Sequence, residues 1–100
     1  MAEISDLRTA LETLGPRAAR LTALEIVDWL ENVFHYGTIT LPEENYEEDI
    51  YPIQLEFSTG KLKFLFQINP QGGMEVWRRT AFVGTSMDDF SLAVFMEEEY

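Results

Sequence analysis

The chain has 100 residues, of which 46% are hydrophobic and 13% aromatic. This is the composition of a folded globular domain, and it argues against wholesale disorder. The chain carries 18 acidic and 7 basic side chains, a net charge of −11, so direct binding to nucleic acid or to an anionic membrane is not expected. The absence of cysteine excludes disulfides and thiolate chemistry, and it favours a reducing compartment.

These numbers predict a single domain over residues 1–100, located in the cytoplasm. The first six residues contain neither a basic stretch nor an apolar stretch, so they do not form a signal peptide. The longest uncharged apolar stretch, Phe90 to Met96, is too short to cross a bilayer.

Two helices are predicted at the N-terminus. Apolar residues recur at helical spacing from Ile4 to Leu14, and Gly15-Pro16 then ends the first helix. Thr22 and Glu25 form a T-x-x-E pattern, which predicts a capping box and a second helix that begins at Thr22. We interpret His35 as a residue of that helix's last turn and not as a metal ligand.

A stretch without basic residues connects this helix to the strands. No Lys or Arg occurs between Arg20 and Lys61, and the segment from Leu41 to Asp49 is an acidic loop. The loop lacks the residue spacing and the glycine of a calcium-binding loop, so no metal site and no cofactor are predicted. The acidity either solubilises the protein or attracts a basic partner.

Three strands are predicted after the loop. Folding about Thr59-Gly60 pairs Phe57 with Leu62 and places Glu56 opposite Lys63, which satisfies both faces of a hairpin. Asn69-Pro70-Gln71-Gly72-Gly73 reverses the chain.

A third strand then runs from Met74 to Val83, with Val76 and Phe82 on one face and Trp77 on the other. Both of its faces are partly apolar, so we expect another element or a partner to cover the second face.

The segment from Ser86 to Glu98 fits two structures. Ser86 followed by two aspartates is typical of a helix start, whereas alternating apolar residues favour a strand. We predict a helix. The expected fold is therefore α+β, with two N-terminal helices, a three-stranded antiparallel β-meander and a C-terminal helix, the alternative being a fourth strand.

The function that fits this profile is a non-enzymatic binding module or inhibitor that engages a basic protein through an acidic face. Immunity proteins, inhibitors of defence nucleases and secretion chaperones are typically small and acidic, and they lack cysteine and a catalytic motif. The residues expected to bind the partner are Asp28, Trp29, Glu31, Glu43, Glu44, Tyr46, Glu47, Glu48 and Asp49.

Three other roles stay open. A homodimeric structural or assembly subunit is suggested by the two-faced third strand and by the edges of the sheet. A small enzyme would have to rely on carboxylates alone for acid–base chemistry. A winged-helix derivative with an acidic surface would contact protein in place of DNA.

Overall fold

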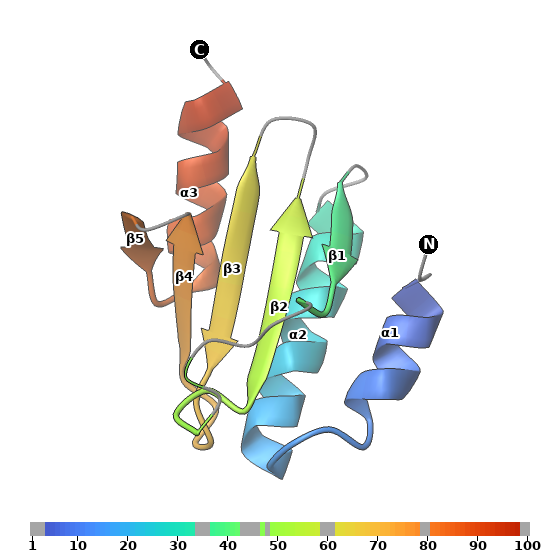
Figure 1. Cartoon of the computed structure of the whole chain (residues 1–100). Coiled ribbons are helices and arrows are strands. Elements are labelled where there is room, and N and C mark those ends of the chain that lie inside the picture. Colours follow the sequence, from blue (N-terminus) through green and yellow to red (C-terminus); the bar gives the residue numbers. More distant parts are fainter. Residues whose placement is uncertain are drawn as a thin grey trace.

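The computed structural model of the chain describes residues 4–33, 37–42, 47, 49–58, 62–78 and 81–98. It shows helices and an antiparallel sheet, so the predicted α+β class is confirmed (Figure 1). The sheet has five strands in the order β1-β2-β3-β4-β5, and the prediction of three strands was wrong. In chain order the elements are α1 (Ile4–Leu11), α2 (Arg17–Val33), β1 (Thr38–Thr40), β2 (Ile53–Ser58), β3 (Lys63–Ile68), β4 (Met74–Arg78), β5 (Ala81–Gly84) and α3 (Met87–Glu98).

The helices α1 and α2 form one N-terminal helical region, and α2 begins at Arg17 rather than at Thr22. Proline favours the start of a helix, and the carbonyl of Pro16 accepts a hydrogen bond from the backbone N–H of Arg20 at 2.9 Å. Thr22 therefore lies inside the helix, and the predicted capping box was wrong. The Thr22 hydroxyl donates to the backbone oxygen of Gly72 at 2.7 Å, which ties α2 to the turn between β3 and β4.

The hairpin of β2 and β3 has a different register from the predicted one. Phe57 pairs with Phe64 and not with Leu62. The strands end at residue 58 and resume at residue 63, so the connection is longer than the predicted two-residue turn. The shift amounts to two residues and leaves every side chain on its predicted face. Lys63 Nζ still lies 3.2 Å from Glu56 Oε1, although the two residues are diagonal neighbours.

The predicted third strand is in fact two strands. β4 and β5 are antiparallel, with Trp77 opposite Phe82 and Arg78 opposite Ala81. The chain reverses between Arg78 and Ala81, and the two intervening residues include no Gly, Asn or Asp, so the sequence carries no hairpin signal there. The reversal puts Phe82 on the same face as Trp77, whereas the prediction placed them on opposite faces.

The short strand β1 was not predicted. Ile39 at its centre is buried and pairs with Phe57 of β2. Three residues are too few for an alternation pattern to stand out in a sequence.

The C-terminal helix is confirmed as α3. Ser86 Oγ accepts a hydrogen bond from the Asp89 backbone N–H, and Asp89 Oδ2 accepts one from the Thr85 backbone N–H, both at 3.2 Å. These reciprocal bonds satisfy two backbone donors at the helix start. Within the described ranges, no helix combines the length and the apolar character needed to cross a bilayer.

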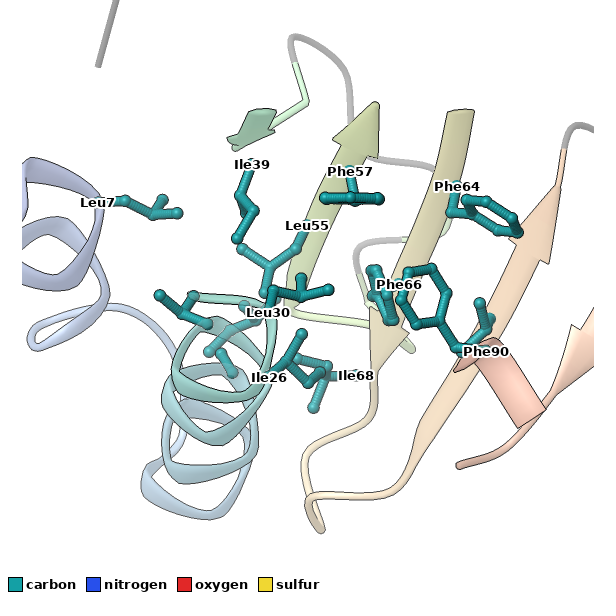
Figure 2. Packing of buried hydrophobic residues seen from close by; sticks show 14 of the residues in the cluster. Leu7, Ile26, Leu30, Ile39, Leu55, Phe57, Phe64, Phe66, Ile68 and Phe90 are labelled. Atoms are coloured by element: carbon teal, nitrogen blue, oxygen red, sulfur yellow. The ribbon is translucent and has the colours of Figure 1, made fainter. Parts of the chain in front are cut away.

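The core lies between one face of the sheet and the helices, with Leu7 and Leu11 of α1 also buried in it; in Figure 1, α2 lies behind β1 and β2, and α3 lies behind β3 and β4. The Phe90 ring of α3 lies 5.6, 5.0 and 5.0 Å from the rings of Phe57, Phe64 and Phe66, between ring centroids. Figure 2 shows these rings together with Leu30 of α2, which lies on the side of Phe66 away from Phe90. We call the opposite side of the sheet the open face; its side chains include those of Gln54, Glu56, Leu65, Gln67, Glu75, Trp77 and Phe82.

Candidate functional site

The acidic side chains of α2 are engaged by a residue of α1. Asp28 and Glu31 are both exposed, and the Arg8 guanidinium donates hydrogen bonds to each of them. The distance from Arg8 Nη2 to Glu31 Oε2 is 2.5 Å. The hydrogen bonds to Glu31 and Asp28 raise the pKa of the Arg8 guanidinium, which stays charged. The guanidinium of Arg8 thus already pairs with Asp28 and Glu31, the two α2 carboxylates that were predicted to bind the partner.

Trp29 belongs to a different side of the same helix. Its ring meets the Phe90 ring of α3 edge to face, with 6.2 Å between centroids and 74° between planes. Neighbouring helical residues point about 100° apart, so Trp29 does not share a patch with Asp28. The side chain is partly buried and packs against the core.

The predicted loop residues are only partly within the described chain. Glu47 and Asp49 are exposed, and Ile50 is 54% exposed. The backbone oxygen of Glu47 accepts hydrogen bonds from the N–H groups of Ile50 and Tyr51, both at 2.9 Å. We call Glu47, Asp49, Ile50 and Tyr51 the acidic turn. The other predicted loop residues, Glu43, Glu44, Tyr46 and Glu48, lie outside the described residues.

Tyr51 anchors the acidic turn to the open face. Its hydroxyl donates a hydrogen bond to the Glu75 carboxylate of β4, and its backbone oxygen accepts one from Gln54 Nε2 of β2 at 3.2 Å. Tyr51 thus links β2 to β4, two strands that are separated by β3 in the sheet. The hydrogen bond to Glu75, with contributions from burial and nearby negative charge, raises the pKa of the Tyr51 phenol.

The other end of the open face carries an aromatic pair. Trp77 lies opposite both Leu65 of β3 and Phe82 of β5. The rings of Trp77 and Phe82 meet edge to face, with centroids 5.2 Å apart, and Phe82 remains 53% exposed. Trp77 Nε1 is a buried donor for which the described part of the protein offers no acceptor.

The described residues of the predicted site therefore lie on two separate surfaces. Asp28 and Glu31 lie on the helix layer, whereas the acidic turn is tied to the opposite side of the sheet through Tyr51. Sequence reasoning missed the Tyr51 anchor and the exposure of Phe82. The position of Phe82 could have been found by placing a chain reversal between β4 and β5, because that reversal moves Phe82 to the face of Trp77.

The described residues include no group of three or more His, Cys, Asp or Glu side chains arranged to hold a metal ion. No family model, curated protein or solved structure matches this chain.

Proposed function

We propose that this protein is a non-enzymatic, cytoplasmic binding module that engages a basic protein surface through its acidic side chains. The observation that carries the proposal is the anchored acidic turn. Two exposed carboxylates, Glu47 and Asp49, stand on a backbone that is fixed by its own hydrogen bonds and by Tyr51. Binding through a fixed turn avoids much of the entropy cost of ordering a loop.

The turn combines charge with apolar area. Ile50 is 54% exposed and lies beside Asp49 in the chain. Carboxylates steer a basic partner and set its orientation, while an apolar side chain adds buried area at the contact. The net charge of −11 adds a long-range attraction that speeds the encounter. An inhibitor or a chaperone of a basic protein would use such a surface.

The α2 carboxylates play the smaller part in this proposal. A basic partner that approaches Asp28 or Glu31 has to compete with Arg8, which already binds both. The acidic turn has no such competitor among the ion pairs of the described residues. We therefore assign the main contact to the turn.

The test is capture of binding proteins on the immobilised chain, in about 50 mM and about 500 mM salt, followed by their identification. We expect basic proteins that are released at the higher salt concentration. The double variant Glu47→Lys with Asp49→Lys should then lose at least about tenfold in affinity for the purified binding protein.

The matched control is Glu12→Lys with Glu25→Lys, which makes the same change in net charge at two other exposed positions. It should bind more tightly than the turn variant. Equal losses in the two variants would show that only net charge matters. Binding that does not respond to salt, or the absence of any captured protein, would contradict the proposal.

A further inference from the structure

The side chains of the open face form rows across the strands. One row consists of Gln54, Gln67 and Glu75. Tyr51 binds the two ends of this row, since its backbone oxygen accepts a hydrogen bond from Gln54 and its hydroxyl donates one to Glu75. Gln54 and Gln67 are 1% and 6% exposed. The protein itself thus covers this row and leaves little of it for a partner.

The next row ends in an exposed ring. It consists of Glu56, Leu65, Trp77 and Phe82, which face one another from β2 to β5. Phe82 is 53% exposed, and its ring packs edge to face against Trp77 with centroids 5.2 Å apart. Because this contact restricts the ring, a ligand that binds its exposed side has little side-chain entropy to remove.

Phe82 lies close to the residue that anchors the acidic turn. Trp77 is two residues from Glu75 in β4 and faces Phe82 in β5. Strand geometry therefore places the Cα atoms of Glu75 and Phe82 about 8 Å apart, on the same face of the sheet. Because Glu75 accepts the hydrogen bond from Tyr51 of the acidic turn, a partner bound at the turn can also contact Phe82.

The charge around Phe82 favours a cation. Of the described side chains on the open face, Glu56 and Glu75 are acidic, and Lys63 is the one basic group, 3.2 Å from Glu56. The acidic turn adds two exposed carboxylates. Carboxylates attract positive charge, and the face of an aromatic ring attracts a cation within about 6 Å through its quadrupole. The ring and its surroundings thus select the same kind of ligand.

We propose that Phe82 is a second contact point for the basic partner, at which a lysine or arginine side chain lies over the exposed ring. This inference deepens the proposed function and rests on it. The carboxylates of the acidic turn bind cations of the partner by charge, and Phe82 binds a further cation through a cation–π interaction. The alkyl stem of a lysine or arginine also covers the apolar ring. Phe82 therefore selects, among basic proteins, those with a cation placed beside the one that the turn binds.

The test compares variants of Phe82 that leave the net charge unchanged, with a decalysine peptide as the probe in about 50 mM salt. The general attraction of the peptide to an acidic protein is then the same for every variant. Phe82→Leu keeps an apolar side chain but has no aromatic ring, and it should bind the peptide about two- to fivefold more weakly. Phe82→Trp should bind at least as tightly as the natural chain. Equal affinities of Phe82→Leu and the natural chain would overturn the proposal.

Fluorinated phenylalanine at position 82 separates a cation–π contact from an apolar one. Fluorine withdraws negative charge from the face of the ring and changes its shape little. The affinity for decalysine should therefore fall stepwise as one, two and three fluorine atoms are added. An affinity that stays constant or rises along this series would overturn the assignment to a cation–π interaction.

Leu92→Ala is the matched control. Leu92 is 59% exposed and belongs to α3, on the other side of the sheet. The substitution removes exposed apolar area without a change in charge, and it should leave the affinity for decalysine unchanged. A loss equal to that of Phe82→Leu would overturn the placement of the contact at Phe82. Circular dichroism establishes that each variant is folded.

The double variant Glu47→Lys with Asp49→Lys separates this inference from the proposed function. If the turn variant loses affinity and Phe82→Leu does not, the contact at Phe82 is overturned and binding at the acidic turn stands. If Phe82→Leu loses affinity and the turn variant binds as tightly as Glu12→Lys with Glu25→Lys, the acidic turn is not the main contact, and the cation site at Phe82 stands alone.

Discussion

The two faces of one sheet are built in different ways. On the core face, Phe57, Phe64 and Phe66 are almost fully buried and surround Phe90. On the open face, Tyr51 donates a hydrogen bond to Glu75 at one end, and Phe82 is exposed at the other end. Side chains alternate along each strand, so the same strands contribute residues to both faces.

This difference separates stability from interaction. The core face has many contacts that support one another, and a change in one of them is felt by several neighbours. The open face carries the hydrogen bond from Tyr51 to Glu75 at one end and the 53% exposed ring of Phe82 at the other, and we propose that the side with the acidic turn is the one used for binding. We therefore expect substitutions to divide between the two faces according to what they disturb.

The largest effect is expected for Phe90→Ala. This ring contacts three rings of the sheet and Trp29, so its removal leaves a cavity and should lower the free energy of unfolding by about 3–5 kcal/mol. Phe82→Ala is the matched change on the other face and should cost less than about 1 kcal/mol, since Phe82 is 53% exposed. Urea unfolding of both variants measures the difference, and equal losses would contradict the division between the faces.

A smaller effect is expected for Tyr51→Phe, which removes the hydrogen bond to Glu75. The free energy of unfolding should fall by about 1 kcal/mol. The pKa of Tyr51 is raised in the folded protein, so the stabilisation is fully present below pH about 10 and is lost as the pH rises through the raised value.

Ultraviolet absorbance of phenolate tests the Tyr51 titration directly. The natural chain should contain a tyrosine that titrates above the ordinary range, and Tyr51→Phe should remove it. If the variant and the natural chain lose stability alike with rising pH, the hydrogen bond to Glu75 does not anchor the turn.

The smallest effect is expected for Trp77→Phe. The change removes buried apolar area, but it also removes an indole N–H that has no acceptor among the described residues. An unsatisfied buried donor costs about 1–3 kcal/mol, so the two contributions should nearly cancel and leave a net change within about 1 kcal/mol. A loss above about 2 kcal/mol in urea unfolding would indicate that the N–H has an acceptor after all.

The sequence was sufficient for features that depend on local patterns. Alternation assigned β2 and β3 to the correct faces even though the register was wrong by two residues, because a shift of two preserves the face. The Ser86 and Asp89 pattern identified the start of α3 correctly. The T-x-x-E pattern at Thr22 misled because Pro16 had already started the helix.

Features that depend on distant contacts could not be predicted. The reversal between β4 and β5 carries no turn residue, and its stability comes from cross-strand contacts such as Trp77 with Phe82. The anchor from Tyr51 to Glu75 joins a residue of the acidic turn, before β2, to a residue of β4. Neither contact leaves a signal in a local window, so the division of the acidic residues between two surfaces emerged only from the fold.

The most direct test of the division between the faces uses the two tryptophans, one on each side of the sheet. Trp29 packs on the core side and Trp77 lies on the open face beside Phe82. Their indole N–H signals can be followed by NMR in the natural chain and in Phe82→Ala. We predict that the substitution moves the Trp77 signal, because the Phe82 ring contacts Trp77, and leaves the Trp29 signal in place on the other side of the sheet. A comparable shift of the Trp29 signal, or no shift of the Trp77 signal, would contradict the account.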